Sequence, residues 1–168
     1  EDAWVANRPG VELAQRAVDV ILNPSASHFS FGKRLIRERF VQEGARAFHC
    51  AYVYANLVGN EAGRAIYDGD CLIASQGALI ARSEPFQFQD IVLVDAVVDL
   101  EANRVNRNRQ ASYRPAVDRL ENLCETEHDL LTDAPLTRGP LTERTYDKNE
   151  EFYRAVALGL FDYMRKAR

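Results

Sequence analysis

The stretch that decides the fold is residues 20–33, which read Val20-Ile21-Leu22-Asn23-Pro24-Ser25-Ala26-Ser27-His28-Phe29-Ser30-Phe31-Gly32-Lys33. It begins as a short apolar run, continues through small polar residues and ends in a Gly-Lys pair that opens a helical pattern. The apolar run has the length of a strand, and we expect it to be buried on both faces, as in a parallel sheet. Open α/β folds bind ligands at the carboxyl edge of such strands. We therefore expect a ligand site where this strand ends.

Helical and extended patterns alternate on both sides of this strand. The expected elements are a helix over residues 9–19, a helix from Gly32 to about Phe48, and strands over residues 51–56, 71–75, 78–82 and 91–100. Gln76-Gly77 is a two-residue hairpin connection, and residues 59–63 are a loop. Helices that alternate with strands, followed by strands in succession, predict a layered α/β sandwich with a mixed sheet.

The helix that begins at Gly32 is amphipathic in its sequence. Its predicted inner face carries Leu35, Ile36, Phe40 and Phe48. Its predicted solvent face carries Lys33, Arg34, Arg37, Glu38, Arg39 and Glu43.

The character of the chain changes after Leu100. Residues 101–146 mix charge clusters with Pro and Gly, which predicts a helix end and then a long linker of the kind found between domains. The last segment is helical again, with Asp147 and Glu150 spaced as in a capping box. Its apolar stripe needs a surface to pack on, and it consists of Phe152, Val156, Leu160, Tyr163 and Met164.

Composition narrows the function classes. Of 168 residues, 46% are hydrophobic and 27% charged, and the net charge of −4 favours neither nucleic acid nor a membrane surface. No apolar run approaches the roughly 18 residues of a membrane span. The three cysteines form neither a disulfide framework nor a metal signature, which indicates reduced thiols in a cytoplasmic protein. We expect no metal site.

Two residues of the central stretch could carry chemistry. Ser27 follows the strand, and Lys33 lies in the first turn of the next helix, where a cation opposes the helix dipole. One interpretation is that Ser27 caps the helix and Lys33 is solvated. The other is that both bind a carboxylate or phosphate at the helix N-terminus.

The order and spacing of several motifs resemble the glutamine-dependent NAD synthetases of the nitrilase (carbon–nitrogen hydrolase) superfamily. Glu1-Asp2-Ala3-Trp4 is similar to the end of the sequence Cys-Glu-Asp-x-Trp that holds their nucleophile. The resemblance continues along the chain in Asn23 to Ser27, Gly32-Lys33, Tyr52 to Asn56, Tyr67-Asp68-Gly69, the Arg-Asn-Arg segment at 107–109 and His128 to Leu131. It covers essentially the whole chain.

The resemblance implies a fold and a division into domains. Residues 1–105 would be the C-terminal half of a nitrilase-type α-β-β-α sandwich, the glutaminase domain. Residues 106–146 would be an interdomain linker, and residues 147–168 the first helix of an ATP-pyrophosphatase-type synthetase domain. The chain would then be a segment of a longer enzyme, beginning just after its catalytic cysteine.

The resemblance also implies a reaction. The parent enzyme would hydrolyse L-glutamine through a thioester and use the ammonia, with ATP and Mg²⁺, to amidate deamido-NAD in the second domain. Glu1, Ser27 and Lys33 would line the glutamine pocket, while the catalytic Glu, Lys and Cys would lie outside the segment, leaving it inactive alone. The rest of its own chain would be a partner, and a homo-oligomer is expected. The alternatives are a stand-alone amidase of the superfamily and a non-catalytic interaction module.

Overall fold

The computed structural model describes residues 3–61, 64–116, 123–127, 141 and 146–167. Its helices are α1 (Pro9–Gln15), α2 (Lys33–Phe48), α3 (Leu100–Arg109) and α4 (Lys148–Lys166). Its strands are β1 (Val20–Ser25), β2 (Ala51–Asn56), β3 (Val58–Glu61), β4 (Ala65–Asp68), β5 (Cys71–Ser75) and β6 (Ala78–Arg82). Among these described helices, none is both long enough and apolar enough to cross a membrane.

The centre of the fold is a mixed four-stranded sheet in the order β1-β2-β5-β6. β1 pairs with β2 in parallel, because α2 carries the chain back between them, and the other two pairings are antiparallel. β5 and β6 are joined through Gln76 and Gly77, both with positive φ, as a tight hairpin turn requires. The predicted mixed α/β architecture is therefore confirmed.

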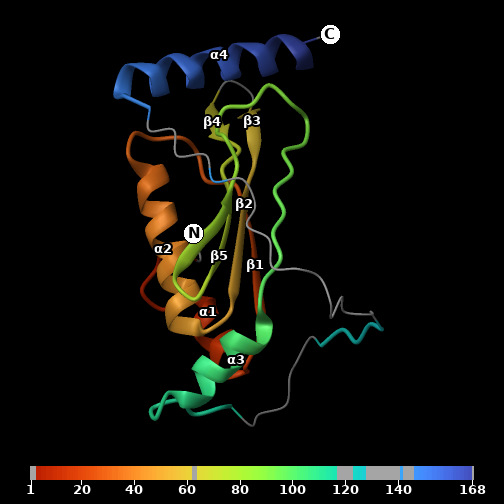
Figure 1. The fold of residues 1–168 in the computed structure, drawn as a ribbon. Helices are drawn as coiled ribbons and strands as arrows, with labels where there is room; N and C mark the ends of the chain where they lie inside the picture. Colours follow the sequence, from red (N-terminus) through yellow and green to blue (C-terminus); the bar gives the residue numbers. More distant parts are fainter. Residues whose placement is uncertain (1–2, 62–63, 117–122, 128–140, 142–145, 168) are drawn as a thin grey trace.

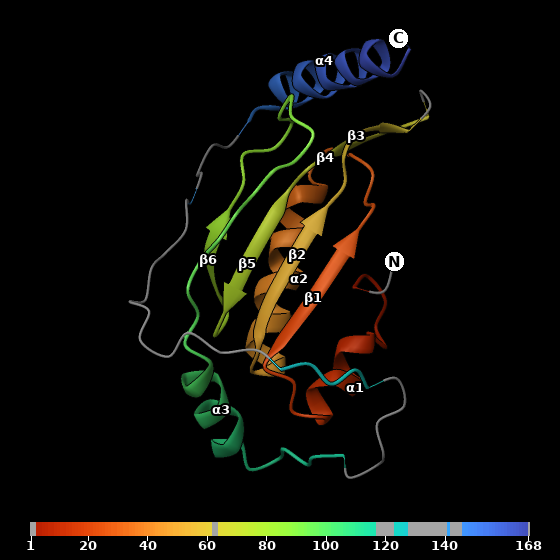
Figure 2. The same ribbon diagram turned by 90° about the vertical axis from the view of Figure 1, so that its right-hand side faces the viewer.

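One face of the sheet is covered by α2, as Figures 1 and 2 show. The core between them contains Ile21, Phe40, Val41, Ala45, Tyr52, Tyr54, Leu72 and Ala74. The predicted faces of α2 are wrong in its first turns. Arg34 and Arg37 are buried, whereas Leu35 and Ile36 are 53% and 47% exposed. The arginines turn inward because two buried carboxylates lie opposite them, Asp68 at the end of β4 and Asp70 just after it.

Three other predictions about strands are wrong. The apolar run of β1 is buried on one face only, since Val20 and Leu22 are exposed. Of the loop expected over residues 59–63, residues 59–61 belong to strand β3, which pairs antiparallel with β4, and residues 62–63 lie outside the described residues. Residues 91–99 form no strand, although they are extended in pattern; they run from the α4 end to α3 on the side of the sheet opposite α2 (Figure 1).

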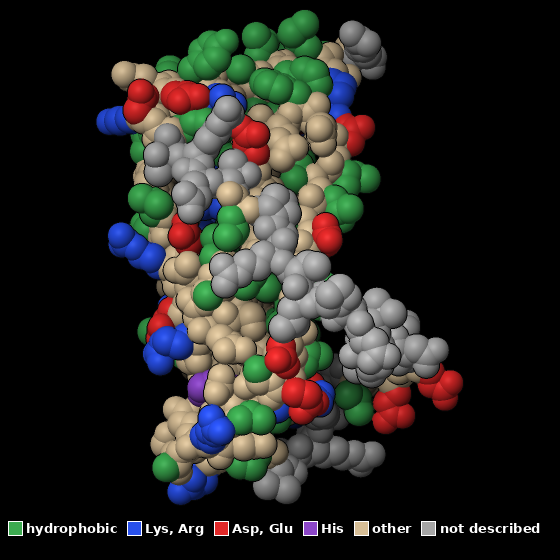
Figure 3. Space-filling model, in the orientation of Figure 1, with side chains coloured by type: hydrophobic (Ala, Val, Ile, Leu, Met, Phe, Trp, Pro, Cys, Tyr) green, Lys and Arg blue, Asp and Glu red, His purple; other side chains and the backbone are tan. Residues whose placement is uncertain are grey.

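Helices α3 and α4 lie at opposite ends of the molecule (Figure 1). α4 begins at Asp147, whose carboxylate accepts the N–H groups of Asn149 and Glu150, so the predicted cap is confirmed. It packs on the β3–β4 hairpin through Ala155 and Leu158, while its predicted apolar stripe remains exposed. Figure 3 shows hydrophobic side chains gathered over this end. α3 crosses the position at 105/106 where we expected the domain boundary.

Candidate functional site

A pocket of about 500 Å³ lies at the carboxyl end of β1. Its wall is formed by Trp4 and Val5, by Asn23 to His28 in sequence, and by Lys33 at the start of α2. The parallel pair β1 and β2 ends here, and the chain turns away toward α2, which leaves the strand end uncovered. Ser27 and Lys33, the two sequence-predicted residues that the structure describes, thus line one cavity. The third, Glu1, lies outside the described residues.

Lys33 supplies the positive charge of this pocket. Its ammonium donates to the carbonyl oxygen of His28 at 3.1 Å and lies 5.3 Å from the centre of the Trp4 ring. Burial, and then the neighbouring Arg37 cation, lower the pKa of Lys33 from its usual value. Gly32, with φ of +75°, precedes the helix, and no side chain caps it there. Ser27 is therefore not the helix cap, and the helix N-terminus is open to an anion.

Ser27 is held through its backbone, and its buried hydroxyl lies beside the hydroxyl of Tyr54. The residue is 8% exposed, and within the described part of the chain its Oγ has no hydrogen-bond partner. Burial raises the pKa of the Tyr54 hydroxyl, while the Arg37 cation and then the nearby hydroxyls of Ser25 and Ser27 oppose that shift. A buried hydroxyl without a partner costs free energy that a ligand or water can recover.

On the β1 side of the pocket, polar side chains hydrogen-bond one another. Asn23 donates from Nδ2 to the Tyr52 hydroxyl at 2.8 Å, and the Ser25 hydroxyl donates to Asn23 Oδ1 at 3.0 Å. Sequence reasoning did not assign Asn23 or Trp4 to the site. The signal for Asn23 was its alternation with Ser25 on a strand that starts apolar, which places both on the same face.

A buried charge cluster lies behind the pocket. Arg37 makes a bidentate pair with Asp68, with one N···O distance of 2.7 Å, and both side chains are inaccessible to solvent or nearly so. Asp70 lies 3.6 Å from Arg34, 4.0 Å from Arg37 and 3.8 Å from Arg82. Burial, followed by repulsion from Asp68, raises the pKa of Asp70 to about 6.

The cysteines do not offer a nucleophile to this pocket. Cys50 is buried, and burial raises the pKa of its thiol to about 12. Cys71 is half-buried and its thiol pKa is also raised, chiefly by burial, whereas Cys124 is exposed. None of the three lines the pocket. Among the described residues, no group of three His, Cys, Asp or Glu side chains could hold a metal ion.

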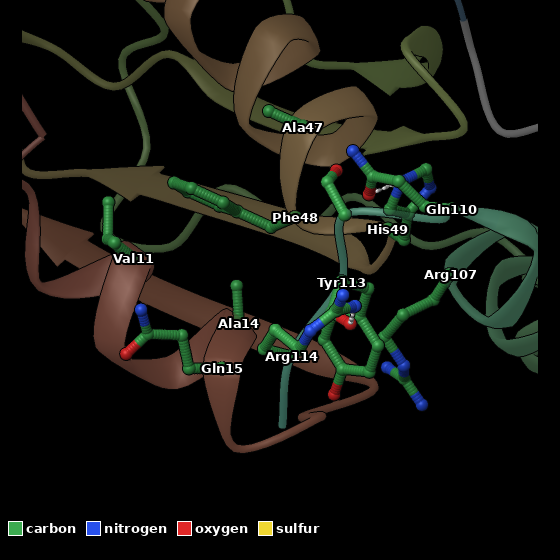
Figure 4. A pocket seen from close by; sticks show the side chains of 11 residues that line it. Val11, Ala14, Gln15, Ala47, Phe48, His49, Arg107, Gln110, Tyr113 and Arg114 are labelled. Carbon is green, nitrogen blue, oxygen red and sulfur yellow. Dashed lines mark hydrogen bonds between the residues drawn. The ribbon is translucent and has the colours of Figure 1, made fainter. Parts of the chain in front are cut away.

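Two other cavities differ in character from the first. One, of about 290 Å³, lies between α1, the end of α2 and the segment after α3 (Figure 4). There His49 contacts Gln110 at 2.9 Å and Arg114 donates to main-chain carbonyl groups, while the buried Tyr113 hydroxyl has no hydrogen-bond partner among the described residues. The second, of about 520 Å³, lies between α4 and the β3–β4 hairpin and is mostly apolar. The pocket of Ser27 and Lys33 is therefore the best candidate site.

Comparison with known proteins gives a consistent result. No protein-family model matches the chain. A glutamine-dependent NAD(+) synthetase of Oryza sativa subsp. indica is 31% identical over 177 residues, which cover 100% of this chain and 24% of the relative. The Homo sapiens protein of the same name is 27% identical over 175 residues, covering 99% of this chain and 24% of that protein. The chain thus spans about a quarter of these relatives.

Solved structures agree with the sequence relatives. The crystal structure of a glutamine-dependent NAD(+) synthetase from Cytophaga hutchinsonii is 36% identical, with a TM-score of 0.57, over 92% of this chain and 19% of that one. The synthetase from Acinetobacter baumannii, solved with ADP, is 20% identical with a TM-score of 0.67, over 98% of this chain and 24% of that one. The resemblance found in the sequence is confirmed: along nearly its whole length, the chain is related to a segment of these enzymes.

Proposed function

We propose that this chain is part of a glutamine-dependent NAD(+) synthetase, in which hydrolysis of the glutamine amide supplies ammonia for the ATP-dependent amidation of deamido-NAD to NAD. The observation that carries the proposal is the relation to such enzymes over the full chain, together with a pocket in which Ser27 and Lys33 converge. Their role would be to bind the amino-acid end of glutamine.

The chemistry of the pocket fits that role. The Lys33 ammonium, at the N-terminus of α2, can pair with the α-carboxylate of glutamine, because both its charge and a helix N-terminus without a side-chain cap favour an anion. The Ser27 hydroxyl can donate to the carboxylate or accept from the α-ammonium. Holding this end would leave the side-chain amide free to extend toward a nucleophile.

The reaction itself needs groups that lie outside this chain. A cysteine thiolate would attack the amide carbon, and the C–N bond would break with proton transfer to the departing ammonia. Water would then cleave the thioester to give glutamate and regenerate the thiol. We infer that the chain alone is inactive, and that ATP and Mg²⁺ bind elsewhere in the parent enzyme; the Acinetobacter relative was solved with ADP.

The finer fold and domain division are also proposals. We propose that residues 1–105 are half of an α-β-β-α sandwich, 106–146 a linker and 147–168 the start of the synthetase domain. The exposed apolar side chains on the uncovered side of the sheet support this, since a second sheet would bury them: Leu22 is 71%, Ile91 78% and Leu93 84% exposed. The rest of the chain is thus a partner, and we expect a cytoplasmic homo-oligomer.

The test compares two nitrogen sources in the full-length enzyme. Lys33→Ala should raise the KM for glutamine about ten- to a hundredfold, because a charged contact is lost, and Ser27→Ala by about three- to tenfold. NAD formation from free ammonium should be unchanged in both. The control is Arg46→Ala, an exposed cation on the same helix whose partner Glu43 is also exposed.

Three outcomes would contradict the proposal. Equal losses with glutamine and with ammonium would mean that the two residues do not act at the glutamine site. Glutamine hydrolysis without any NAD formation from ammonium would favour a stand-alone amidase. Absence of both activities from the wild-type enzyme would favour a non-catalytic module.

A further inference from the structure

The backbone of Ser27 is bound by a single side chain, that of Asn56. Asn56 Oδ1 accepts the Ser27 N–H at 2.8 Å, and Asn56 Nδ2 donates to the Ser27 carbonyl at 2.9 Å. Both residues are 8% exposed. Asn56 is the last residue of β2, whereas β1 ends at Ser25, so the amide continues the pairing of the two strands beyond the end of β1.

The orientation of the Asn56 amide is fixed from behind. The second hydrogen of Nδ2 is donated to Asp68 Oδ1 at 2.7 Å, and Asp68 is itself held by the bidentate contact with Arg37. If the amide were flipped, its oxygen would face the Asp68 carboxylate and its nitrogen would face the Ser27 N–H. Both contacts would be repulsive, so the Asp68 charge selects one orientation.

The segment after Ser27 is held independently. The Phe29 N–H donates to the Ile66 carbonyl at 2.6 Å, and His28 forms an antiparallel bridge with Tyr67. Loss of the Asn56 contacts should therefore leave residues 28–29 docked on β4 while Ser27 becomes free to move. This confines the expected effect to the residue that lines the pocket.

We propose that Asn56, oriented by Asp68, is a positioning residue that sets where the Ser27 hydroxyl stands in the pocket; its effect on glutamine rests on the function proposed above. An asparagine is suited to this task because one planar amide both accepts and donates. Aspartate has nearly the same shape but cannot donate. Asn56→Asp would therefore place a carboxylate oxygen against the Ser27 carbonyl and the Asp68 carboxylate, and both contacts would be repulsive.

The first readout requires no ligand. In the full-length enzyme without glutamine, hydrogen exchange at the Ser27 amide should accelerate about tenfold or more in Asn56→Ala, because its acceptor is gone. Exchange at residues 51–55 should stay slow. The matched control is Asn103→Ala, which removes another buried amide, bonded to Ser75 and remote from the pocket, and should leave Ser27 exchange unchanged.

The second readout separates positioning from general damage. Asn56→Ala should raise the KM for glutamine about tenfold with a smaller change in kcat, and should leave NAD formation from ammonium intact. Asp68→Asn, which keeps an acceptor oxygen but loses the charge, should act in the same direction and more weakly; it serves if Asn56→Ala does not fold.

The outcomes distinguish this inference from the proposed function. Unchanged Ser27 exchange in both Asn56→Ala and Asp68→Asn would overturn it, as would faster exchange with an unchanged KM. If the wild-type enzyme does not use glutamine, the proposed function fails, and hydrogen exchange still decides whether Asn56 positions Ser27.

Discussion

The two ends of the sheet are each held by an arginine–aspartate pair between distant segments, but water reaches only one pair. Near the pocket, Arg37 and Asp68 are 0% and 2% exposed. At the other end, Arg104 of α3 binds Asp19 before β1, with side chains 39% and 26% exposed and an Nε···Oδ1 distance of 3.0 Å.

This difference in exposure indicates which end of the sheet is held more rigidly. A buried pair cannot exchange its partner for water, so each charge depends on the other, whereas an exposed pair can be solvated when it opens. The pocket therefore lies over the more fixed end. The following substitutions would break or sharpen the comparison.

The largest expected effect is that of Asp68→Ala. It leaves the Arg37 guanidinium buried without its bidentate partner and removes an acceptor from Asn56. Breaking such a pair should lower the free energy of unfolding by about 3–5 kcal/mol, measured by urea denaturation. Asp68→Asn, the control, should cost less because it still accepts hydrogen bonds. A loss below about 1 kcal/mol would place this pair in the same class as the exposed one.

Asp70 should make the buried end sensitive to pH. Its pKa is about 6 in the folded protein, above the unfolded value of about 3.9. The folded state thus holds the proton more tightly, and this stabilisation is complete below about pH 4 and is lost as the pH rises through 6. Relative to Asp70→Asn, the wild-type free energy of unfolding should fall by about 2–3 kcal/mol between pH 4 and 7. A difference that is flat or rises over this range would contradict the prediction.

Local sequence signals predicted most helices and strands, but they did not predict the buried cluster of Arg37, Asp68 and Asn56. The apolar and β-branched runs of β2, β5 and β6 and the cap of α4 depend on neighbours in sequence, and their positions are confirmed. Arg37, Asp68 and Asn56 come from three elements, and nothing local marks a charged residue as buried. Arg37 was assigned to the solvent face because a charge is normally found there.

The sequence pattern also gave a wrong prediction where an extended apolar segment has no neighbouring strand to pair with. Residues 91–96 alternate in exposure, as a strand does, but no neighbouring strand pairs with residues 91–99 within the described chain. β-propensity reports fit to a half-buried surface and not the presence of a partner. Likewise, Ser27 and Lys33 were found from a strand end and a helix start, whereas Asn56, which positions Ser27 in our proposal, is joined to it only by tertiary contact.

The buried neutral pair of Asn103 and Ser75, at the α3 end, should have an effect between those of the buried and the exposed charged pairs. Asn103 is 1% exposed and donates to the Ser75 hydroxyl at 3.1 Å. Asn103→Ala should cost about 1–3 kcal/mol, since the Ser75 hydroxyl remains buried and unpaired, and the cost should not depend on pH. In the double variant Ser75→Ala, Asn103→Ala, the total should be smaller than the sum of the single losses, because no polar group is left unpaired. Strict additivity would mean that the two side chains do not interact.

The smallest effect should come from Arg104→Ala, which opens the exposed pair. Arg104 is the chief reason that the pKa of Asp19 is lowered, yet solvent screens the contact. α3 also stays attached through Arg107, which is nearly buried and donates to the Val18 carbonyl at 3.2 Å. We therefore expect the smallest loss of unfolding free energy of the series in urea denaturation, vanishing in about 1 M salt, where the screening length is about 3 Å. Arg107→Ala should cost more and keep its effect in salt, because water does not replace its contacts. Equal losses from the two substitutions would mean that burial does not decide how much such an arginine contact contributes.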